Sequence, residues 1–154
     1  MKLDSAQVIP IESNVEILVH DVVTGELLKR MAYHNLVPLV ARDQIRDFLF
    51  SGAAGGNISH FAVGTGTNDP ASSDTALQTE VYRAALTKKT SSSGQVGYQQ
   101  YLGSAEANGN TLTEAGLFNQ AAGGMLFARV KHQTLAKTAA ITVTYNWTIN
   151  INAG

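Results

Sequence analysis

The stretch Ile141-Thr142-Val143-Thr144-Tyr145-Asn146-Trp147-Thr148-Ile149-Asn150-Ile151 alternates apolar and polar residues from end to end. Such period-two alternation is typical of a β-strand with one buried face and one polar face. At roughly 3.3 Å per residue, a strand over 141–151 spans about 35 Å, which is the height of a small domain. The stretch therefore predicts a long strand that forms one wall of a β fold.

Shorter strand-like stretches lie upstream and are separated by turn residues. A hairpin is predicted over 15–34, because Thr24-Gly25 stands between two strand-like runs. A second hairpin is predicted over 82–102, with Ser91-Ser92-Ser93-Gly94 as its turn. Single strands are predicted over 58–63, 111–119 and 125–132. The sequence thus favours a mainly β protein, an antiparallel β-sandwich or jelly-roll-like domain.

Helical patterns are rare in this chain. One short amphipathic helix is predicted over about 38–50, because Pro38 suits its first turn and Ser51-Gly52 ends it. Its apolar positions are Val40, Ile45, Phe48 and Leu49. The capping sequence Ser73-Asp74-Thr75 predicts a further helical turn that runs to about Val81.

The N-terminal residues differ from the rest of the chain. Residues 1–14 show no helical periodicity and contain Pro10, so we expect an extended arm that contacts a neighbouring molecule, with a frayed end as the alternative. Residues 15–154 contain no repeat and no linker, and we expect them to form a single β-sandwich domain. The candidate interaction residues of the arm are Leu3, Val8, Ile9, Pro10 and Ile11.

Composition excludes several classes of protein. The net charge is -1, from 11 Lys and Arg against 12 Asp and Glu, so no basic excess indicates a nucleic acid or an anionic membrane as partner. No apolar stretch approaches the roughly 20 residues of a membrane span, and the N-terminus lacks the apolar core of a secretory signal. The absence of cysteine excludes disulfides, thiolate metal sites and cysteine nucleophiles.

Motifs for chemistry are also missing. Gly64-Thr65-Gly66 lacks the remaining residues of a phosphate-binding loop, and no Gly-x-Ser-x-Gly motif occurs. The four histidines are not spaced as metal ligands. We therefore predict no catalytic, cofactor-binding or metal-binding residues and no small-molecule substrate. A small hydrolase in which Glu114 is catalytic stays a distant alternative.

Charged residues within apolar stretches predict structural ion pairs. Glu114 lies in Leu112-Thr113-Glu114-Ala115-Gly116-Leu117-Phe118, and Arg129 lies in Leu126-Phe127-Ala128-Arg129-Val130. Such a pair fixes the register of strands more reliably than it adds stability. The candidate ion-pair residues are Glu80, Arg83, Glu114 and Arg129.

Several of these strings occur together in one kind of protein. Phe61-Ala62-Val63-Gly64-Thr65-Gly66-Thr67, with Asp74-Thr75-Ala76-Leu77 and Glu80-Val81-Tyr82-Arg83 after it, resembles a pattern of small virion structural proteins of tailed bacteriophages. Thr113-Glu114-Ala115-Gly116-Leu117-Phe118 and the closing Trp147-Thr148-Ile149 match in the same order. The resemblance covers about Tyr33 to Ile151.

The resemblance implies a role in the particle and no catalytic residues. Proteins of this kind serve as capsid decoration (cement) proteins, or in tail-fibre and baseplate contexts. We accordingly expect a virion protein that is assembled in the bacterial cytoplasm and forms a homo-oligomer, a trimer by the resemblance. Its partner is expected to be the major capsid protein or, for a tail-tip, tail-fibre or baseplate-associated adaptor, the tail proteins. An adaptor of this kind docks a receptor-binding protein or reads a host surface glycan.

Overall fold

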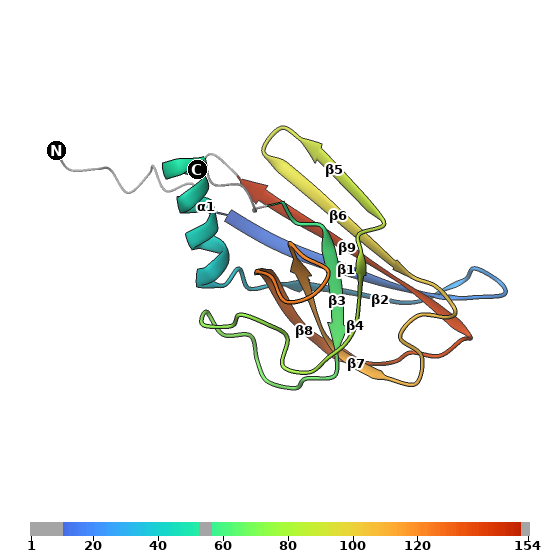
Figure 1. Ribbon diagram of the computed structural model, residues 1–154. Coiled ribbons are helices and arrows are strands. Elements are labelled where there is room, and N and C mark those ends of the chain that lie inside the picture. Colours follow the sequence, from blue (N-terminus) through green and yellow to red (C-terminus); the bar gives the residue numbers. More distant parts are fainter. Residues whose placement is uncertain (1–10, 53–56, 152–154) are drawn as a thin grey trace.

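Two antiparallel β-sheets, packed face to face, form the body of the molecule (Figure 1). The computed structural model describes residues 11–52 and 57–151. One sheet contains, in spatial order, β2 (Leu27–His34), β1 (Ile11–Asp21), β9 (Ile141–Ile151), β6 (Gln95–Leu102) and β5 (Lys88–Ser92). The other contains, in spatial order, β4 (Glu80–Ala85), β3 (His60–Gly64), β7 (Thr111–Phe118) and β8 (Leu126–Ala136). The fold is mainly β, as the sequence predicts.

Strand β9 lies at the centre of the five-stranded sheet. It pairs along its whole length with β1, from Ile11 opposite Ile151 to Asp21 opposite Ile141, and with β6 on its other side. Four apolar residues of its alternation are buried in the sandwich, namely Val143, Tyr145, Trp147 and Ile149, while Ile141 and Ile151 at its two ends are less buried. The ring of Tyr145 lies 4.8 Å from that of Phe61 in the opposite sheet, so this face of β9 joins the two layers.

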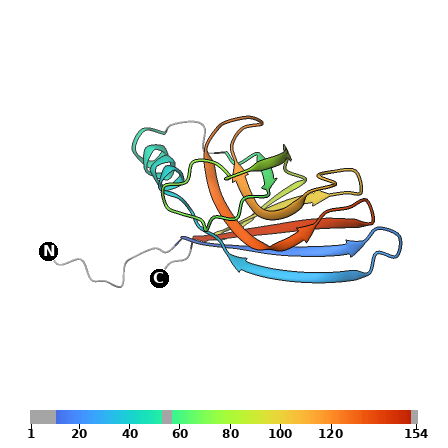
Figure 2. The ribbon, with the colours of Figure 1, turned by 90° about the horizontal axis from the view of Figure 1, so that it is seen from below.

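Helix α1 (Leu39–Ser51) lies at the end of the sandwich where β1 begins and β9 ends (Figures 1 and 2). Pro38 is its N-cap and Gly52 its C-cap, which confirms both predicted ends. Of the four predicted apolar positions, Val40 and Ile45 pack against the core, whereas Phe48 and Leu49 are exposed.

The boundary between arm and domain differs from the sequence prediction. Strand β1 begins at Ile11, so residues 11–14 belong to the sheet rather than to an arm. Residues 11–14 pair with residues 148–151 of β9. Because β9 extends this far, its edge offers backbone hydrogen-bond partners to residues before Val15, and β1 begins earlier than the sequence predicts. The other arm candidates, Leu3, Val8, Ile9 and Pro10, lie outside the described residues.

Two further predictions are corrected by the structure. The stretch 82–90 is not one strand, because β4 pairs with β3 in one sheet and β5 pairs with β6 in the other. The hairpin of β5 and β6 itself is present. No helical turn follows Asp74, whose carboxylate binds a distant arginine, and Val81 lies in β4.

Candidate interaction surface

The outer face of the five-stranded sheet carries two rows of side chains that cross all of its strands. The register of the sheet places the members of each row directly opposite one another. The first row consists of His34, Asn14, Thr148, Gly97 and Thr90. The second consists of Ala32, Glu16, Asn146, Gln99 and Lys88. We call these two rows the polar face.

Strand alternation brings these residues to one surface. In β9, Asn146 and Thr148 point outward because their neighbours Tyr145 and Trp147 point into the core. Gly97 leaves room for the side chain of Thr90 on the paired strand, since a Cβ at Gly97 would lie 2.4 Å from the Thr90 hydroxyl oxygen. The polar face therefore has low points at Gly97 and Ala32, where the side chains are smallest.

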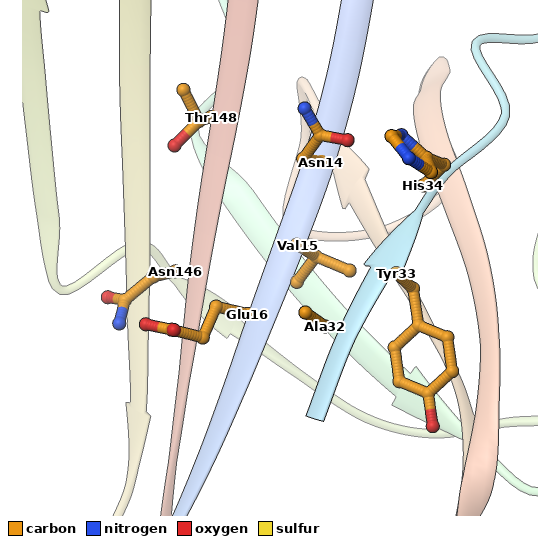
Figure 3. A pocket seen from close by; sticks show the side chains of 8 residues that line it. All are labelled: Asn14, Val15, Glu16, Ala32, Tyr33, His34, Asn146 and Thr148. Carbon is orange, nitrogen blue, oxygen red and sulfur yellow. The ribbon is translucent and has the colours of Figure 1, made fainter. Parts of the chain in front are cut away.

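Two shallow depressions lie on the polar face, on either side of Asn146 and Thr148. The larger, about 410 Å³, lies over β2, β1 and β9, and Figure 3 shows Asn14, Glu16 and Thr148 around it. The smaller, about 230 Å³, lies over β9, β6 and β5 and includes Gly97. Hydrogen-bonding side chains thus border both depressions.

Neutral groups dominate the polar face. Its charged members are Glu16, which pairs with Arg30, and Lys88. The Gln99 amide donates to Asn146 Oδ1 at 2.9 Å, which orders two neighbouring amides. Among the described residues, the side chains of Asn14 and His34 have no hydrogen-bond partner. An array of amides and hydroxyls, which both donate and accept hydrogen bonds, suits contact with another polar surface.

A separate feature, the ion cluster, is buried in the other sheet and centres on Glu114. Its Oε1 accepts hydrogen bonds from the backbone N–H groups of Gly66 at 3.0 Å and Thr79 at 2.8 Å. Its Oε2 accepts from the backbone N–H of Gln78 at 3.1 Å and from Arg129. The carboxylate therefore holds both ends of the loop that connects β3 to β4.

Arg129 completes the ion cluster. Its guanidinium lies 2.9 Å from Glu114 Oε2 and 2.6 Å from Asp74 Oδ2, and it donates to the backbone carbonyl of Asn68 at 3.1 Å. Both Arg129 and Glu114 are buried, so their opposite charges compensate each other where water is excluded. The structure thus brings together two of the sequence-derived candidates and adds Asp74, which the sequence placed in a helix cap.

Gly66 is required by the close approach of this loop to Glu114. A Cβ at Gly66 would lie 2.4 Å from Glu114 Oε1 and 2.5 Å from the Cβ of Gln78. The Thr113 hydroxyl also donates to the Gly66 carbonyl at 2.7 Å. The oxygens of Glu114 are therefore occupied in positioning the loop, and this positioning is the role that the geometry gives to Glu114.

The other sequence-derived pair, Glu80 and Arg83, lies on edge strand β4. Arg83 binds both carboxylate oxygens of Glu80, at 2.8 and 2.6 Å, and its guanidinium carbon lies 3.6 Å from the centre of the Phe118 ring. It also donates to the carbonyls of Gln120 and Gly123. This pair therefore joins β4 to the turn after β7 and is separate from the ion cluster.

His132 of β8 lies between the sheets with two tyrosines. Its Nδ1 lies 2.8 Å from the carbonyl oxygen of Gln133, and its Nε2 lies 3.3 Å from the Tyr145 hydroxyl. The Tyr33 hydroxyl accepts a hydrogen bond from the backbone N–H of Gln133 at 3.0 Å. Burial lowers the pKa of His132, and the charge of Lys29 lowers it further. Burial raises the pKa of Tyr145, which keeps its hydroxyl protonated.

This environment predicts a loss of stability in acid. Because the pKa of His132 is lowered in the fold, the unfolded chain binds a proton first as the pH falls. The free energy of unfolding should stay level above about pH 6.5 and fall below it, by at most about 1.4 kcal/mol per pH unit for one proton. Urea unfolding at several pH values measures this slope. His132→Gln should flatten it, whereas an equal slope in the variant would contradict the assignment.

The sequence analysis did not predict the polar face. The alternation in 141–151 predicted that one side of the strand is polar, but did not show which residues of other strands lie beside it. A usable signal is present in that alternation, because its outward positions hold only threonine and asparagine and no charge. Depletion of charged residues is one feature of the centre of protein interfaces.

Over residues 11–52 and 57–151, no group of three or more histidine and acidic side chains is placed to hold a metal ion. In the same part of the chain, no helix combines the length and apolar character of a membrane span. No protein-family model, curated protein or solved structure matches the sequence or fold of this chain.

Proposed function

We propose that this chain is a non-enzymatic structural protein of a bacteriophage particle. Its role is that of a capsid decoration (cement) protein, which binds the assembled head as a homo-oligomer, a trimer by resemblance. The observation that carries the proposal is the polar face, two rows of mostly neutral side chains across five paired strands. The order of phage-like strings in the sequence supports a place in the phage particle, at the head or at the tail.

The outer face of the five-stranded sheet, with the polar face at its centre, has a size that suits a protein contact. Five strands of 5 to 11 residues, at about 3.3 Å per residue and about 4.8 Å spacing, give this outer face an area on the order of 600 Å². A standard protein interface covers about 800 Å² on each partner, so the sheet supplies most of one contact. Repetition of that contact around a symmetric oligomer multiplies weak binding into firm attachment to the head.

The chemistry of the polar face also suits such a contact. Burying a charge costs far more free energy than burying an amide or hydroxyl that finds a new hydrogen-bond partner. Asn14, Thr148 and Thr90 carry such neutral groups. They can exchange water for the polar groups of a shell protein at small cost. In this proposal residues 1–10, which lie outside the described residues, add a second contact to a neighbouring subunit or to the shell.

Particle composition tests the proposed location. Quantitative mass spectrometry and gold-labelled antibody on purified particles should find many copies distributed over the head. A handful of copies at the tail end would instead support the tail-associated adaptor. Absence of the chain from purified particles would reject both structural roles.

A charge on the polar face should weaken attachment to the head. Asn146→Lys places a cation at the centre of the face, so we expect at least a tenfold weaker binding to heads that lack this chain, or about 1.4 kcal/mol. Co-sedimentation of purified chain with such heads measures the effect. Ser93→Lys, in the exposed β5–β6 turn, is the matched control and should bind normally. Equal binding by Asn146→Lys and the parent chain would contradict a contact through this face.

The two depressions favour a second candidate function. Amides and hydroxyls such as those of Asn14, Asn146 and Thr90 complement the hydroxyl groups of sugars. A tail-tip or fibre-associated adaptor that reads a host surface glycan would use the same face. Glycan-array binding that is lost in Asn146→Lys, together with a tail location, would support this alternative.

A further inference from the structure

Helix α1 ends in three large apolar side chains that its own sandwich does not cover. Phe48 is 60% exposed, Leu49 78% and Phe50 91%, whereas Ala41 in the first turn is buried. Together the three side chains expose on the order of 400 Å² of apolar surface. A contiguous patch of that size on a soluble protein commonly marks an interaction site.

We propose that this helix end packs against the same helix end of a second copy of the chain. Consecutive helical residues point about 100° apart, so Phe48, Leu49 and Phe50 surround more than half of the helix. A small shift of α1 toward its own sheets would cover only one side of that arc. A partner that approaches the exposed end of the helix covers all three residues.

The charges beside the patch favour a second copy as the occupant. Arg46 pairs with Asp43 at 2.8 Å and with Asp47 at 2.7 Å, and all three side chains are exposed. With Arg42 included, the helix carries two cations and two anions, so identical helices do not repel each other. The ion pairs of Arg46 can then form between copies as well as within one copy. An anionic lipid surface would instead favour an excess of lysine and arginine beside the apolar residues.

Apolar residues near the helix end enlarge the area that this contact can bury. The start of β1 and the end of β9 lie at the same end of the sandwich as α1 (Figure 1). Ile11 and Ile151, the paired terminal residues of these strands, are partly exposed. Their exposed apolar area adds to that of the three helix residues. The sum comes closer to the area of a standard interface, which is about 800 Å² on each partner. The polar face lies on the sheet itself and remains free to bind another protein.

This inference rests on the homo-oligomer of the proposed function and assigns it a surface. The oligomer then has two kinds of interface. The helix ends join the copies around a shared symmetry axis, and the polar faces bind the shell. Closed symmetry of this kind uses the same patch on every copy. Since self-association needs no phage particle, it can be tested apart from attachment to the head.

Sedimentation equilibrium of the full chain tests the proposal. The parent chain, of mass 16.4 kDa, should associate to a dimer or trimer over about 1 to 200 µM. Phe50→Glu should weaken association at least tenfold, because it places a charge where the copies meet. Circular dichroism should be unchanged, since this side chain is almost fully exposed.

Val23→Glu is the matched control. Val23 is also apolar and 88% exposed, but it lies in the β1–β2 turn, away from α1. The control should associate like the parent chain. A parent chain that stays monomeric throughout, or equal association by Phe50→Glu, would overturn the inference and leave the head-binding test unaffected. Phe50-dependent sedimentation with phosphatidylglycerol vesicles, without self-association, would overturn it in favour of a lipid surface.

Discussion

Arg129→Met should lower the free energy of unfolding by about 3–5 kcal/mol, which is the usual effect of removing one partner from a buried ion pair. The cause is the carboxylate of Glu114, which would remain buried without its cation. Asp74 and the carbonyl of Asn68 would lose their guanidinium donor at the same time. Urea unfolding monitored by circular dichroism measures the difference.

Arg30→Met provides the control for this prediction. Arg30 pairs with Glu16 on the surface of the five-stranded sheet, where water screens both charges. Its loss should change the free energy of unfolding by no more than about 1 kcal/mol. If Arg129→Met costs no more than Arg30→Met, the ion cluster does not stabilise the fold in the way that its burial indicates.

A double variant separates the charge from the contacts. In Glu114→Gln/Arg129→Met both buried charges are gone, while the amide oxygen can still accept from the backbone N–H groups of Gly66 and Thr79. We expect the double variant to be more stable than Arg129→Met alone. With Glu114→Gln alone measured in the same way, a double-mutant cycle gives the coupling between the two residues.

Local patterns in the sequence predicted much of the fold. The alternation in 141–151 defined β9 to the residue, because a central strand with one buried face needs that period over its whole length. Pro38 and Gly52 marked the ends of α1, because helix termini require particular backbone conformations. The Thr24-Gly25 turn likewise joined β1 to β2.

Features that depend on contacts distant in sequence were not predictable in this way. Asp74 resembles a helix cap, but its carboxylate binds Arg129, which lies in a strand far along the chain. The run 82–90 reads as one strand, yet its two halves pair with different sheets. The polar face has the same character, since only the register of five strands brings Asn14, Asn146 and Thr90 to one surface.

The exposed end of α1 illustrates a different limit. Phe48 and Leu49 satisfy the amphipathic pattern, which predicts apolar residues but does not state which surface covers them. In the structure, Val40 and Ile45 pack on the core while the last turn extends beyond it. Pattern alone therefore cannot separate a core contact from a contact between molecules.

Trp147→Ala should lower the free energy of unfolding by about 3–5 kcal/mol, as expected for removing a large buried aromatic side chain. Trp147 is buried at the centre of β9, and its ring lies edge-on to Phe61 of the other sheet at 6.1 Å. Its indole N–H also donates to Asn35 Oδ1 at 2.8 Å. The variant would therefore leave a cavity between the sheets and an unpaired amide oxygen.

Thr144→Ala is the matched control, because it changes the outward side of the same strand. Thr144 is only partly buried, so its loss should cost no more than about 1 kcal/mol. Thermal unfolding of both variants under identical conditions compares the two faces of β9. Similar losses in the two variants would contradict the division of β9 into a core face and an outward face. A large difference is expected if the outward side chains contribute little to folding.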